Sequence, residues 1–328
     1  MGEFELIARF FDRPVRRSPL GVGDDCALLQ PAAGMQLAVS TDLLVEGRHF
    51  LSTVDPRRLG HKALAVNLSD LAACGAQPLA FTLAIALPRV DEAWLAAFAQ
   101  GMFALADAHG CELVGGDTTR GPLAIDITVF GEVPAGQALL RSGARAGDEL
   151  WVSGTLGDAR LALEAFRGKV SLPQEVFEAA RRRLELPQPR VALGCALRGI
   201  ASSAIDISDG LAGDLGHVLR RSGVGASVAL AQAPQLLAAA RAGLKLDARL
   251  VEDLVFAGGD DYELAFTAPA SRRDAVEAAA QRAATPVTRI GSIEAAPGLR
   301  LLDGAGHVAS RDFGGFDHFG DSPALSAG

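Results

Sequence analysis

The sequence predicts an α/β protein with two domains. Strand-like apolar runs alternate with helix-like segments along most of the chain, which is the pattern of the α/β class. The chain has 328 residues, which is enough for two domains with separate cores. Pro, Gly and Ser cluster between Pro134 and Gly147, a composition typical of a linker. We therefore expect an N-terminal domain over residues 1–136 and a C-terminal domain over residues 147–328.

In the first domain, apolar runs predict strands at 37–40, 79–87, 111–114 and 124–133. Helices are predicted over 56–75 and 91–109. For the first helix, Asp55 is a suitable N-cap, Pro56 suits the first helical position, and Pro78 follows the end.

The second domain is expected to continue the alternation. Strands are predicted at 149–153, 203–206 and 262–267, and helices at 160–166, 174–184, 209–221 and 271–283. Pro187 and Pro189 interrupt the helical pattern. Ser208 or Asp209 is expected to cap the helix at 209–221. The segment 312–321 is rich in Gly, Asp and Phe and predicts a loop.

The composition is that of a folded protein and restricts the partners. Hydrophobic residues make up 49% and charged residues 21%, which argues against disorder. The net charge of −8 argues against nucleic acid, because phosphate backbones need a basic surface. Anionic substrates remain compatible with this charge, because bound metal ions can supply the positive charge.

Targeting signals and redox context point to the cytoplasm. No apolar run reaches membrane-spanning length, so no membrane partner is expected. The acidic N-terminus lacks the basic start and apolar middle of a signal peptide. The cysteines have no CxxC spacing and are expected to be small buried residues in a reducing compartment. They are Cys26, Cys74, Cys111 and Cys195. The histidines form no HxH or HExxH pattern, which argues against zinc.

Aspartate stands beside glycine or serine in six short stretches. They are Gly23-Asp24-Asp25, Ser40-Thr41-Asp42, Leu68-Ser69-Asp70, Gly115-Gly116-Asp117, Ile205-Asp206-Ile207-Ser208-Asp209-Gly210 and Gly258-Gly259-Asp260-Asp261. Carboxylates bind hard cations such as Mg²⁺ through oxygen, and small neighbours let phosphates approach the backbone. Turn formation explains any single stretch as well, but it explains all six together poorly. They can act together only if the fold gathers them into one cleft.

Six aspartates are candidate metal ligands. They are Asp25, Asp42, Asp70, Asp117, Asp206 and Asp209. Mg²⁺ is usually bound by one or two carboxylates plus phosphates and waters, so this number indicates several ions or one cation-rich cleft. Asp42 and Asp117 are expected to follow short strands, the usual place for ligands in α/β folds. Asp209 fits a plain N-cap equally well.

Three other features each allow two interpretations. Arg141 fits a bidentate phosphate clamp or a solvated loop charge. His49 fits a ligand contact, although a lone histidine is more often structural. The segment Gly154–Gly157 fits a phosphate-binding turn at a helix start, but an ordinary strand-to-helix turn is favoured. Neither GxxxxGK[ST] nor GxGxxG occurs in the sequence.

Ordered motifs along the chain resemble the thiamine-monophosphate kinase family. This family belongs to a superfamily that includes aminoimidazole ribonucleotide synthetase and selenophosphate synthetase. The resemblance runs from Phe4 to Phe319. The motifs that carry it are Gly-Val-Gly-Asp-Asp-Cys-Ala (21–27), Ser-Thr-Asp (40–42), Gly-Arg-His-Phe (47–50), Lys-Ala-Leu-Ala-Val-Asn-Leu-Ser-Asp-Leu-Ala-Ala (62–73), Gly-Gly-Asp-Thr-Thr-Arg-Gly (115–121), Ile-Asp-Ile-Ser-Asp-Gly-Leu (205–211), Gly-Gly-Asp-Asp-Tyr-Glu-Leu (258–264) and Gly-Phe-Asp-His-Phe (315–319).

The resemblance implies a two-domain fold like that of aminoimidazole ribonucleotide synthetase. An N-terminal sheet domain would bind ATP and Mg²⁺ and form a homodimer, and a C-terminal α/β domain would close the cleft. The implied reaction transfers the γ-phosphoryl group of ATP to thiamine monophosphate, giving thiamine diphosphate and ADP, as the last step of thiamine diphosphate biosynthesis. The phosphate acceptor is already largely ionised at neutral pH, since its second pKa is near ~6. Catalysis should therefore be positioning and charge neutralisation, without an acid/base residue.

The resemblance also implies residue roles. Several magnesium ions would be held by Asp25, Ser40, Thr41, Asp42, Asp70, Asp117, Asp206 and Asp209. ATP would contact Gly116, Asp117, Arg141 and Ser208, and the thiamine substrate would contact His49, Asp260 and Phe316. The chain departs from the family at Asp260, where Glu is usual, and at Phe316, where relatives often carry Tyr or Trp.

Three alternatives differ from this reading. Selenophosphate synthetase expects a reactive cysteine with lysine in a glycine-rich N-terminal segment, which the sequence lacks. A hydrogenase maturation factor expects a tail ending in cysteine, whereas this chain ends Ser326-Ala327-Gly328. A non-catalytic metal-binding scaffold has no support from EF-hand spacing.

Overall fold

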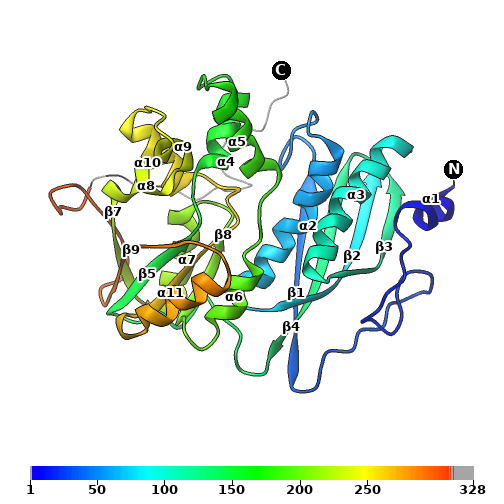
Figure 1. The fold of residues 1–328 in the computed structure, drawn as a ribbon, viewed down its shortest axis with the longest axis horizontal. Coiled ribbons are helices and arrows are strands. Elements are labelled where there is room, and N and C mark those ends of the chain that lie inside the picture. The colour runs from blue at the N-terminus through cyan, green and yellow to red at the C-terminus, as the bar shows by residue number, and fades with distance from the viewer. Residues whose placement is uncertain (1, 310, 312, 314–328) are drawn as a thin grey trace. The chain divides into compact units, whose positions relative to one another are not determined.

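The computed structural model describes residues 2–309, 311 and 313, so Phe316 lies outside the described residues. The chain divides into two compact units. The first holds the described residues up to Leu71 together with Ala76–Gly136, and the second holds Ala72–Gly75 and the described residues from Gln137 onward. Each unit has its own sheet with helices packed on it (Figure 1), which confirms the α/β fold class.

The first unit is one mixed sheet with two long helices on one face. Its sheet order is β1-β4-β2-β3, in which β4 is antiparallel to both neighbours and β2 is parallel to β3. Helices α2 and α3 lie side by side along the sheet (Figure 1). The elements are α1 (Glu3–Phe10), β1 (Met35–Val45), α2 (Pro56–Ala73), β2 (Gln77–Leu87), α3 (Glu92–His109), β3 (Glu112–Arg120) and β4 (Ala124–Pro134).

Helices α2 and α3 touch backbone to backbone at two glycines. A Cβ atom on Gly60 would lie 2.0 Å from the carbonyl oxygen of Phe98. A Cβ atom on Gly101 would lie 1.8 Å from the carbonyl oxygen of Arg57. A larger residue at either position would therefore push the two helices apart.

The two faces of the first sheet differ sharply in exposure. On one face, β4 buries Ile125, Ile127 and Val129, each no more than 1% exposed. On the other face, β1 exposes apolar side chains, with Val39 57% and Leu43 52% exposed. We call these residues the β1 apolar row. They are Met35, Leu37, Val39, Leu43 and Val45, which pair with alternate residues of β4 and therefore share one face.

The second unit is built on a six-stranded sheet with the order β10-β7-β9-β5-β8-β6. All neighbouring strands are antiparallel except β10 and β7. The core joins the sheet residues Val152 and Ile205 to the helix residues Leu215, Leu254 and Phe256. The elements are β5 (Asp148–Ser153), α4 (Asp158–Phe166), α5 (Gln174–Glu185), α6 (Val191–Leu197), β6 (Ser203–Ile207), α7 (Leu211–Ser222), β7 (Gly225–Ala229), a 3₁₀ turn (Leu230–Gln232), α8 (Ala233–Leu236), α9 (Ala238–Arg241), α10 (Ala248–Ala257), β8 (Glu263–Pro269), a second 3₁₀ turn (Ala270–Arg272), α11 (Arg273–Arg282), β9 (Val287–Glu294) and β10 (Gly298–Leu302).

Helix boundaries in the first unit follow the sequence signals, whereas two strands run longer than predicted. Helix α2 begins at Pro56, and the Asp55 side chain accepts a hydrogen bond from the N–H of Arg58. Strands β1 and β3 continue through Asp42 and Asp117, because each is paired along its whole length. The prediction that these two aspartates follow their strands is therefore wrong. Both lie inside strands.

Seven helices and strands of the second unit were not predicted. They are α6, β7, α8, α9, α10, β9 and β10. Most are short, and β7 and β10 begin at glycines that resemble turn residues. Strands this short need pairing with distant neighbours for their stability, and one sequence window does not show that pairing.

The four cysteines do not share one environment. Cys111 is buried and Cys195 is half-buried, but Cys26 and Cys74 are exposed. The prediction of four buried cysteines is therefore wrong for the latter two. Burial raises the pKa of the Cys111 thiol, which keeps this thiol unreactive.

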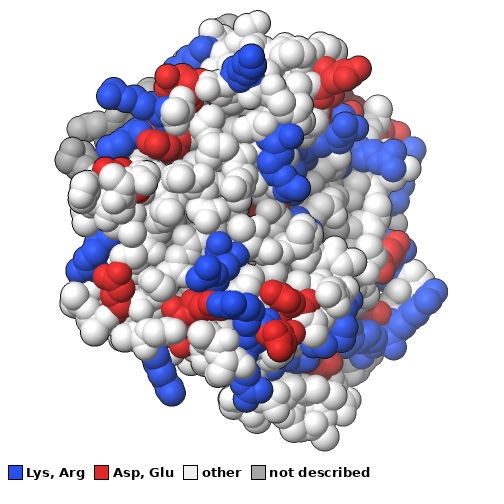
Figure 2. Space-filling model, turned by 60° about the vertical axis from the view of Figure 1, so that its left-hand side comes forward, with Lys and Arg blue, Asp and Glu red and all other residues white. Residues whose placement is uncertain are grey.

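The molecular surface carries both signs of charge. Figure 2 shows basic and acidic side chains interspersed over the face that it draws. No helix in the described part of the chain is both long and apolar enough to cross a membrane.

Candidate functional site

In the first unit, β1 and α2 bring Ser40 and Asp70 together. The Ser40 hydroxyl donates to Oδ2 of Asp70 at 2.6 Å. Ser40 and Asp42 pair with Val129 and Ile127, so both side chains lie on the helix-covered face of the sheet. This face therefore holds a hydroxyl and two carboxylates from two neighbouring elements, all of them oxygen donors.

Thr41 lies on the opposite, open face. It pairs with Thr128, whose hydroxyl donates to the Thr41 hydroxyl at 3.1 Å. The Thr41 hydroxyl lies 3.2 Å from Oδ1 of Asp126, to which it donates. Sequence reasoning missed Asp126, because a single carboxylate in an alternating strand resembles an ordinary solvent-facing residue.

Gly116 and Asp117 lie at the far edge of the same sheet. Asp42 is in register with Ile127, which is in register with Leu83 and then with Gly116, so three strand spacings separate β1 from β3. At about 4.8 Å a spacing, the separation along the sheet is roughly 14 Å. Mg–O bonds are only about 2.0–2.1 Å long, so Asp42 and Asp117 of one sheet are too far apart to share one ion.

Glycine is required at position 116. Its φ is 148°, and a Cβ atom there would lie 1.8 Å from the carbonyl oxygen of Leu83. The bare backbone therefore packs directly on β2. This close packing, rather than space for a phosphate, is what the structure itself shows as the reason for glycine.

The remaining candidates of the first unit lie in loops. Asp25 lies in an exposed segment closed by an isolated bridge between Leu20 and Leu28. His49 follows β1, and its Nδ1 accepts a hydrogen bond from the N–H of Val45 at 3.0 Å. In that geometry the neutral ring carries its proton on Nε2.

In the second unit, Asp206, Ser208 and Asp209 are grouped at the end of β6. Asp206 is 5% exposed within β6. The predicted N-cap of the next helix is wrong, because α7 begins after Gly210 and has no side-chain cap. Instead, Oδ2 of Asp214 accepts hydrogen bonds from the N–H groups of Ser208 and Asp209, both at 3.0 Å. Burial raises the pKa of Asp214 to about 7.

A second turn packs against this one. The N–H of Asp260 donates to the carbonyl of Ser208 at 2.9 Å, and the N–H of Tyr262 donates to that of Ile207 at 2.8 Å. A Cβ atom on Gly259 would lie 2.4 Å from the carbonyl oxygen of Ser208. The two turns that carry Ser208, Asp209 and Asp260 are therefore joined through their backbones.

Arg141 lies close enough to this group to affect it electrically. Its carbonyl accepts from the hydroxyl of Ser222. The pKa of His217 is lowered by burial, by Arg220 and by Arg141. The Arg141 charge also favours the ionised form of Asp214 and so partly opposes the effect of burial on the pKa of that carboxyl. The structure thus brings five predicted residues together in the second unit, namely Asp206, Ser208, Asp209, Asp260 and Arg141.

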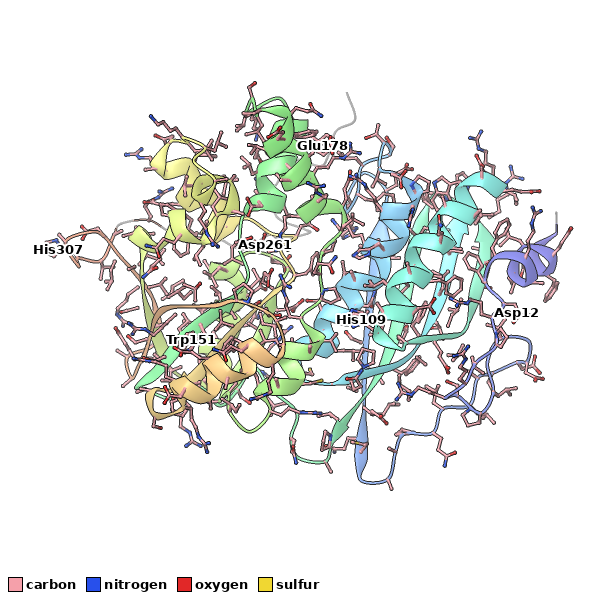
Figure 3. All side chains as sticks on the ribbon, viewed as in Figure 1. Asp12, His109, Trp151, Glu178, Asp261 and His307 are labelled. Carbon is pink, nitrogen blue, oxygen red and sulfur yellow. The ribbon has the colours of Figure 1, made fainter. Side chains whose placement is uncertain are left out.

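Beneath these turns lies a buried group of charges that the sequence did not predict. Both carboxylate oxygens of Asp261 lie 3.0 Å from the N–H of Gly157 and accept from it. This amide belongs to the last residue of the Gly154–Gly157 turn, so the turn is held by a side chain of the protein itself. Burial raises the pKa of Asp261 well above its ordinary value. Figure 3 labels Asp261 within the second unit.

Glu263 is the most strongly bonded member of this buried group. It is 0% exposed and accepts from Ser153 at 2.6 Å, from Arg183 at 2.7 Å and from Arg190 at 2.6 Å. A Cβ atom on Gly154 would lie 2.1 Å from its Oε1. Glu263 therefore ties β5, β8 and the region of α5 and α6 together.

The donor atoms suit magnesium better than a softer metal. Among the described residues, no three His, Cys, Asp or Glu side chains lie close enough to form a ready-made metal cluster. The candidates offer carboxylate and hydroxyl oxygens, which are the ligands of Mg²⁺. Since Mg²⁺ needs only one or two protein carboxylates when phosphates and waters complete its shell, the residues fit this ion.

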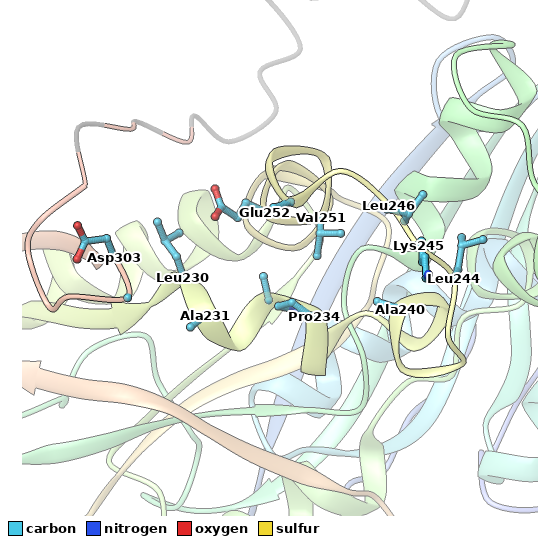
Figure 4. Close-up of a pocket in the computed structure, with 13 residues that line it drawn as sticks. Leu230, Ala231, Pro234, Ala240, Leu244, Lys245, Leu246, Val251, Glu252 and Asp303 are labelled. Carbon is cyan, nitrogen blue, oxygen red and sulfur yellow. The ribbon is translucent and has the colours of Figure 1, made fainter.

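A separate cavity of about 700 Å³ lies elsewhere in the second unit (Figure 4). Apolar side chains such as Leu230, Pro234 and Val251 line it, with Glu252 and Asp303 among the charged residues. None of the predicted site residues is among its lining residues.

Comparison with known proteins identifies the family. The model of the N-terminal domain of AIR synthase related proteins matches residues 23–133, and the model of the C-terminal domain matches residues 145–304. The thiamine-monophosphate kinase of Salmonella typhimurium is 47% identical over 325 residues, covering 97% of this chain and 98% of the relative.

Two solved structures extend the likeness to the fold. The thiamine-monophosphate kinase of Stenotrophomonas maltophilia is similar with a TM-score of 0.82 and 46% identity, covering 93% of this chain and 96% of that one. AaThiL complexed with AMPPCP and TMP is similar with a TM-score of 0.73 and 27% identity, covering 96% of both chains. Both domains and nearly the whole length are matched, and the chain therefore belongs to the thiamine-monophosphate kinase family.

Proposed function

We propose that this protein transfers the γ-phosphoryl group of ATP to thiamine monophosphate, giving thiamine diphosphate and ADP. The observation that carries the proposal is the 47% identity to a thiamine-monophosphate kinase over 97% of the chain. The similar AaThiL structure, which holds AMPPCP and TMP, supports the choice of both substrates. In a cell the reaction would complete thiamine diphosphate biosynthesis, and we propose that it takes place in the cytoplasm.

We propose that the reaction depends on several Mg²⁺ ions. In the first unit Asp25, Ser40, Thr41, Asp42, Asp70 and Asp117 would hold them, and in the second unit Asp206 and Asp209. When bound, the ions would neutralise the charge of the phosphates. The support is the oxygen-only donor set and the Ser40–Asp70 hydrogen bond of 2.6 Å, which already orients one carboxylate.

The protein's own groups would bind and orient the two substrates. Gly116, Asp117, Arg141 and Ser208 would contact ATP, and His49, Asp260 and Phe316 the thiamine substrate. His49 would present its Nε2 proton, since its Nδ1 accepts from Val45. No acid/base residue is needed, because the acceptor phosphate is already ionised.

We propose that the active form is a homodimer formed through the open face of the first sheet. The β1 apolar row supports this, because five apolar side chains of one strand are between 36% and 57% exposed. The register of Asp117 with Ala84 and Asp126 is a second support, because it puts the Asp117 side chain on this open face, where a partner would approach it.

One assay tests the reaction and separates its rivals. ADP release should require thiamine monophosphate, and thiamine diphosphate should appear in equal amount. Thiamine without its phosphate is the matched control and should give no diphosphate. ATP consumption that needs selenide or a carbamoyl donor instead, or no ATP consumption at all, would overturn the proposal.

Phe316 provides a test of the substrate assignment. We propose that its ring stacks on the cationic thiamine moiety, so Phe316→Ala should raise the KM for thiamine monophosphate about three- to thirtyfold. The KM for ATP should change little, and Phe316→Trp should be tolerated. Unchanged kinetics with a lower melting temperature would show that the ring only packs against the protein.

A further inference from the structure

The turn that carries Asp260 has an unusual backbone. Asp260 and Tyr262 have φ values of 65° and 51°, in the left-handed region that bulky side chains rarely adopt. Among the described residues, Ala284 is the one other non-glycine residue with a positive φ. Such conformations are unfavourable and persist only where the surrounding structure fixes them.

Anchors on both sides of the turn fix this backbone. The N–H groups of Asp260 and Tyr262 are bonded to the end of β6, at 2.9 and 2.8 Å. Between them, the buried Asp261 accepts from Gly157. Directly after the turn, Glu263 is bonded to two arginines. Four consecutive residues are thus anchored, and little freedom remains for the turn to relax.

The left-handed backbone places the side chains of this turn in environments that differ in burial. Asp261 and Glu263 are 1% and 0% exposed, whereas Asp260 is half-buried. Tyr262 is 9% exposed, and its hydroxyl lies 3.4 Å from Oδ1 of Asp260, to which it donates. The buried ring holds the hydroxyl in place beside the Asp260 carboxylate.

We infer that Tyr262 is a positioning residue that orients the carboxylate of Asp260 toward the thiamine substrate. The inference rests on the proposed role of Asp260 in binding that substrate. A phenol is a neutral donor, so its hydrogen bond orients the carboxylate without adding a positive charge beside it. An arginine in the same place would orient the group but would also neutralise it.

The orientation of Asp260 matters because its side chain is short. Aspartate has fewer rotatable bonds than glutamate and reaches less far. Its carboxylate therefore depends on the backbone and on its neighbour for placement. The left-handed backbone at Asp260 and the hydroxyl of Tyr262 together supply that placement.

Steady-state kinetics on the full-length enzyme test the inference. Tyr262→Phe removes only the hydroxyl and should raise the KM for thiamine monophosphate about three- to tenfold, with a change of less than about twofold for ATP. Ser227→Ala is the matched control, since it removes a hydroxyl that donates to Glu294 away from this turn. It should change neither KM.

A double-mutant cycle separates positioning from packing. Because Tyr262 acts through Asp260, Tyr262→Phe should add less than about twofold in an Asp260→Asn background. Full additivity, or an equal rise of both KM values, would overturn the inference. If Asp260→Asn alone leaves the KM for thiamine monophosphate unchanged, both the inference and the role of Asp260 fail. If Asp260→Asn raises it but Tyr262→Phe does not, only the inference fails.

A spectroscopic test follows from the composition. Tyr262 is the single tyrosine of the chain, so fluorotyrosine labelling gives one fluorine resonance that reports on this ring alone. Thiamine monophosphate should shift that resonance, and Asp260→Asn should remove most of the shift. A resonance that stays unmoved at saturating thiamine monophosphate would contradict the positioning role.

Discussion

In the first unit Asp42 and Asp117 stand on regular strands, whereas in the second unit Ser208, Asp209 and Asp260 stand in two turns bonded to each other. Asp42 and Asp117 are at opposite edges of a sheet, roughly 14 Å apart by strand spacing. Asp260 and Ser208, in contrast, share a backbone hydrogen bond of 2.9 Å. The second-unit residues are therefore held together by backbone contacts, whereas Asp42 and Asp117 are separated within their sheet.

The two regions also differ in what lies beneath them. The turns of the second unit rest on buried carboxylates with arginine and amide partners, which fix them before any ligand arrives. The sheet of the first unit leaves one face open, with apolar side chains exposed on it. The comparison teaches that buried polar contacts pre-organise the turns of the second unit, whereas the open face of the first sheet has no such contacts described above it.

The largest effect is expected where the buried contacts are broken. Glu263→Ala leaves Arg183 and Arg190 without their carboxylate, although their side chains are only 20% and 19% exposed. The free energy of unfolding should fall by about 3–5 kcal/mol. Asp253→Ala is the control, because its partner Arg311 also pairs with Glu252 and Asp253 is 55% exposed. It should cost less than about 1 kcal/mol.

Denaturant unfolding of the two variants measures this difference. Equal losses for Glu263→Ala and Asp253→Ala would mean that the buried group does not stabilise the turns. The comparison drawn above would then lose its physical basis.

The next largest effect is expected on the activity of variants in the first unit. Asp42→Asn and Asp117→Asn should each lower kcat/KM about a hundredfold or more, which is ~2.7 kcal/mol, without changing the melting temperature. Glu175→Gln, an exposed change on α5, should leave kcat/KM unchanged. Near-normal turnover of either aspartate variant at saturating Mg²⁺ would contradict the metal assignment.

Mixing the two inactive variants sharpens the result. If one site takes Asp42 and Asp117 from different copies, randomly mixed dimers should recover about a quarter of the normal activity. Two differently tagged copies of Asp42→Asn should recover none. Confirmed mixed dimers without recovery would show that the two aspartates serve separate ions.

A smaller effect is expected on the affinity for ATP when Mg²⁺ is removed. The proposed ligands are negatively charged aspartates that would repel a naked triphosphate, so removal of Mg²⁺ should weaken ATP binding at least about tenfold, or ~1.4 kcal/mol. Calorimetry with and without chelator measures this. Tight ATP binding in excess chelator would indicate that Arg141 and backbone amides carry the phosphates instead.

The smallest effect is a pH dependence of stability that arises from Asp261 in the second unit. Burial raises the pKa of Asp261 in the folded state, so its protonated form is favoured there. The contribution of protonated Asp261 to the free energy of unfolding is fully present below the ordinary pKa of aspartate. It is lost as the pH rises through the raised pKa of Asp261 in the folded state. Asp261→Asn is neutral throughout, so it should gain on the order of 1 kcal/mol over the parent at neutral pH and nothing in acid. A difference that does not vary with pH would refute this.

The sequence indicates which residues are candidates for the site, but it does not indicate the geometry of the turns that carry them. Ser208, Asp209 and Asp260 were identified from motifs, because small residues beside carboxylates leave a clear local signal. The inward direction of Asp261 depends on the positive φ values of its neighbours. The alternation of polar and apolar residues in the sequence does not predict this direction of the Asp261 side chain.

The strand order was not predictable from local patterns either. That β1 and β3 occupy opposite edges depends on which strands pair over long distances. The extension of β3 through Gly115 and Gly116 was missed for a related reason. Glycine pairs were read as a break, although here they allow close packing on Leu83.

The glycine contacts between α2 and α3 have a consequence for motion. With backbone on backbone at Gly60 and Gly101, α2 cannot slide or roll along α3 without steric overlap. Asp70 belongs to α2, so its distance from Ser40 is fixed by the backbone contact between the two helices rather than by side-chain packing that can rearrange. Amide protons around this crossing should therefore exchange slowly with solvent, and those on the outer edge of β1, which has no neighbouring strand within its own sheet, should exchange first.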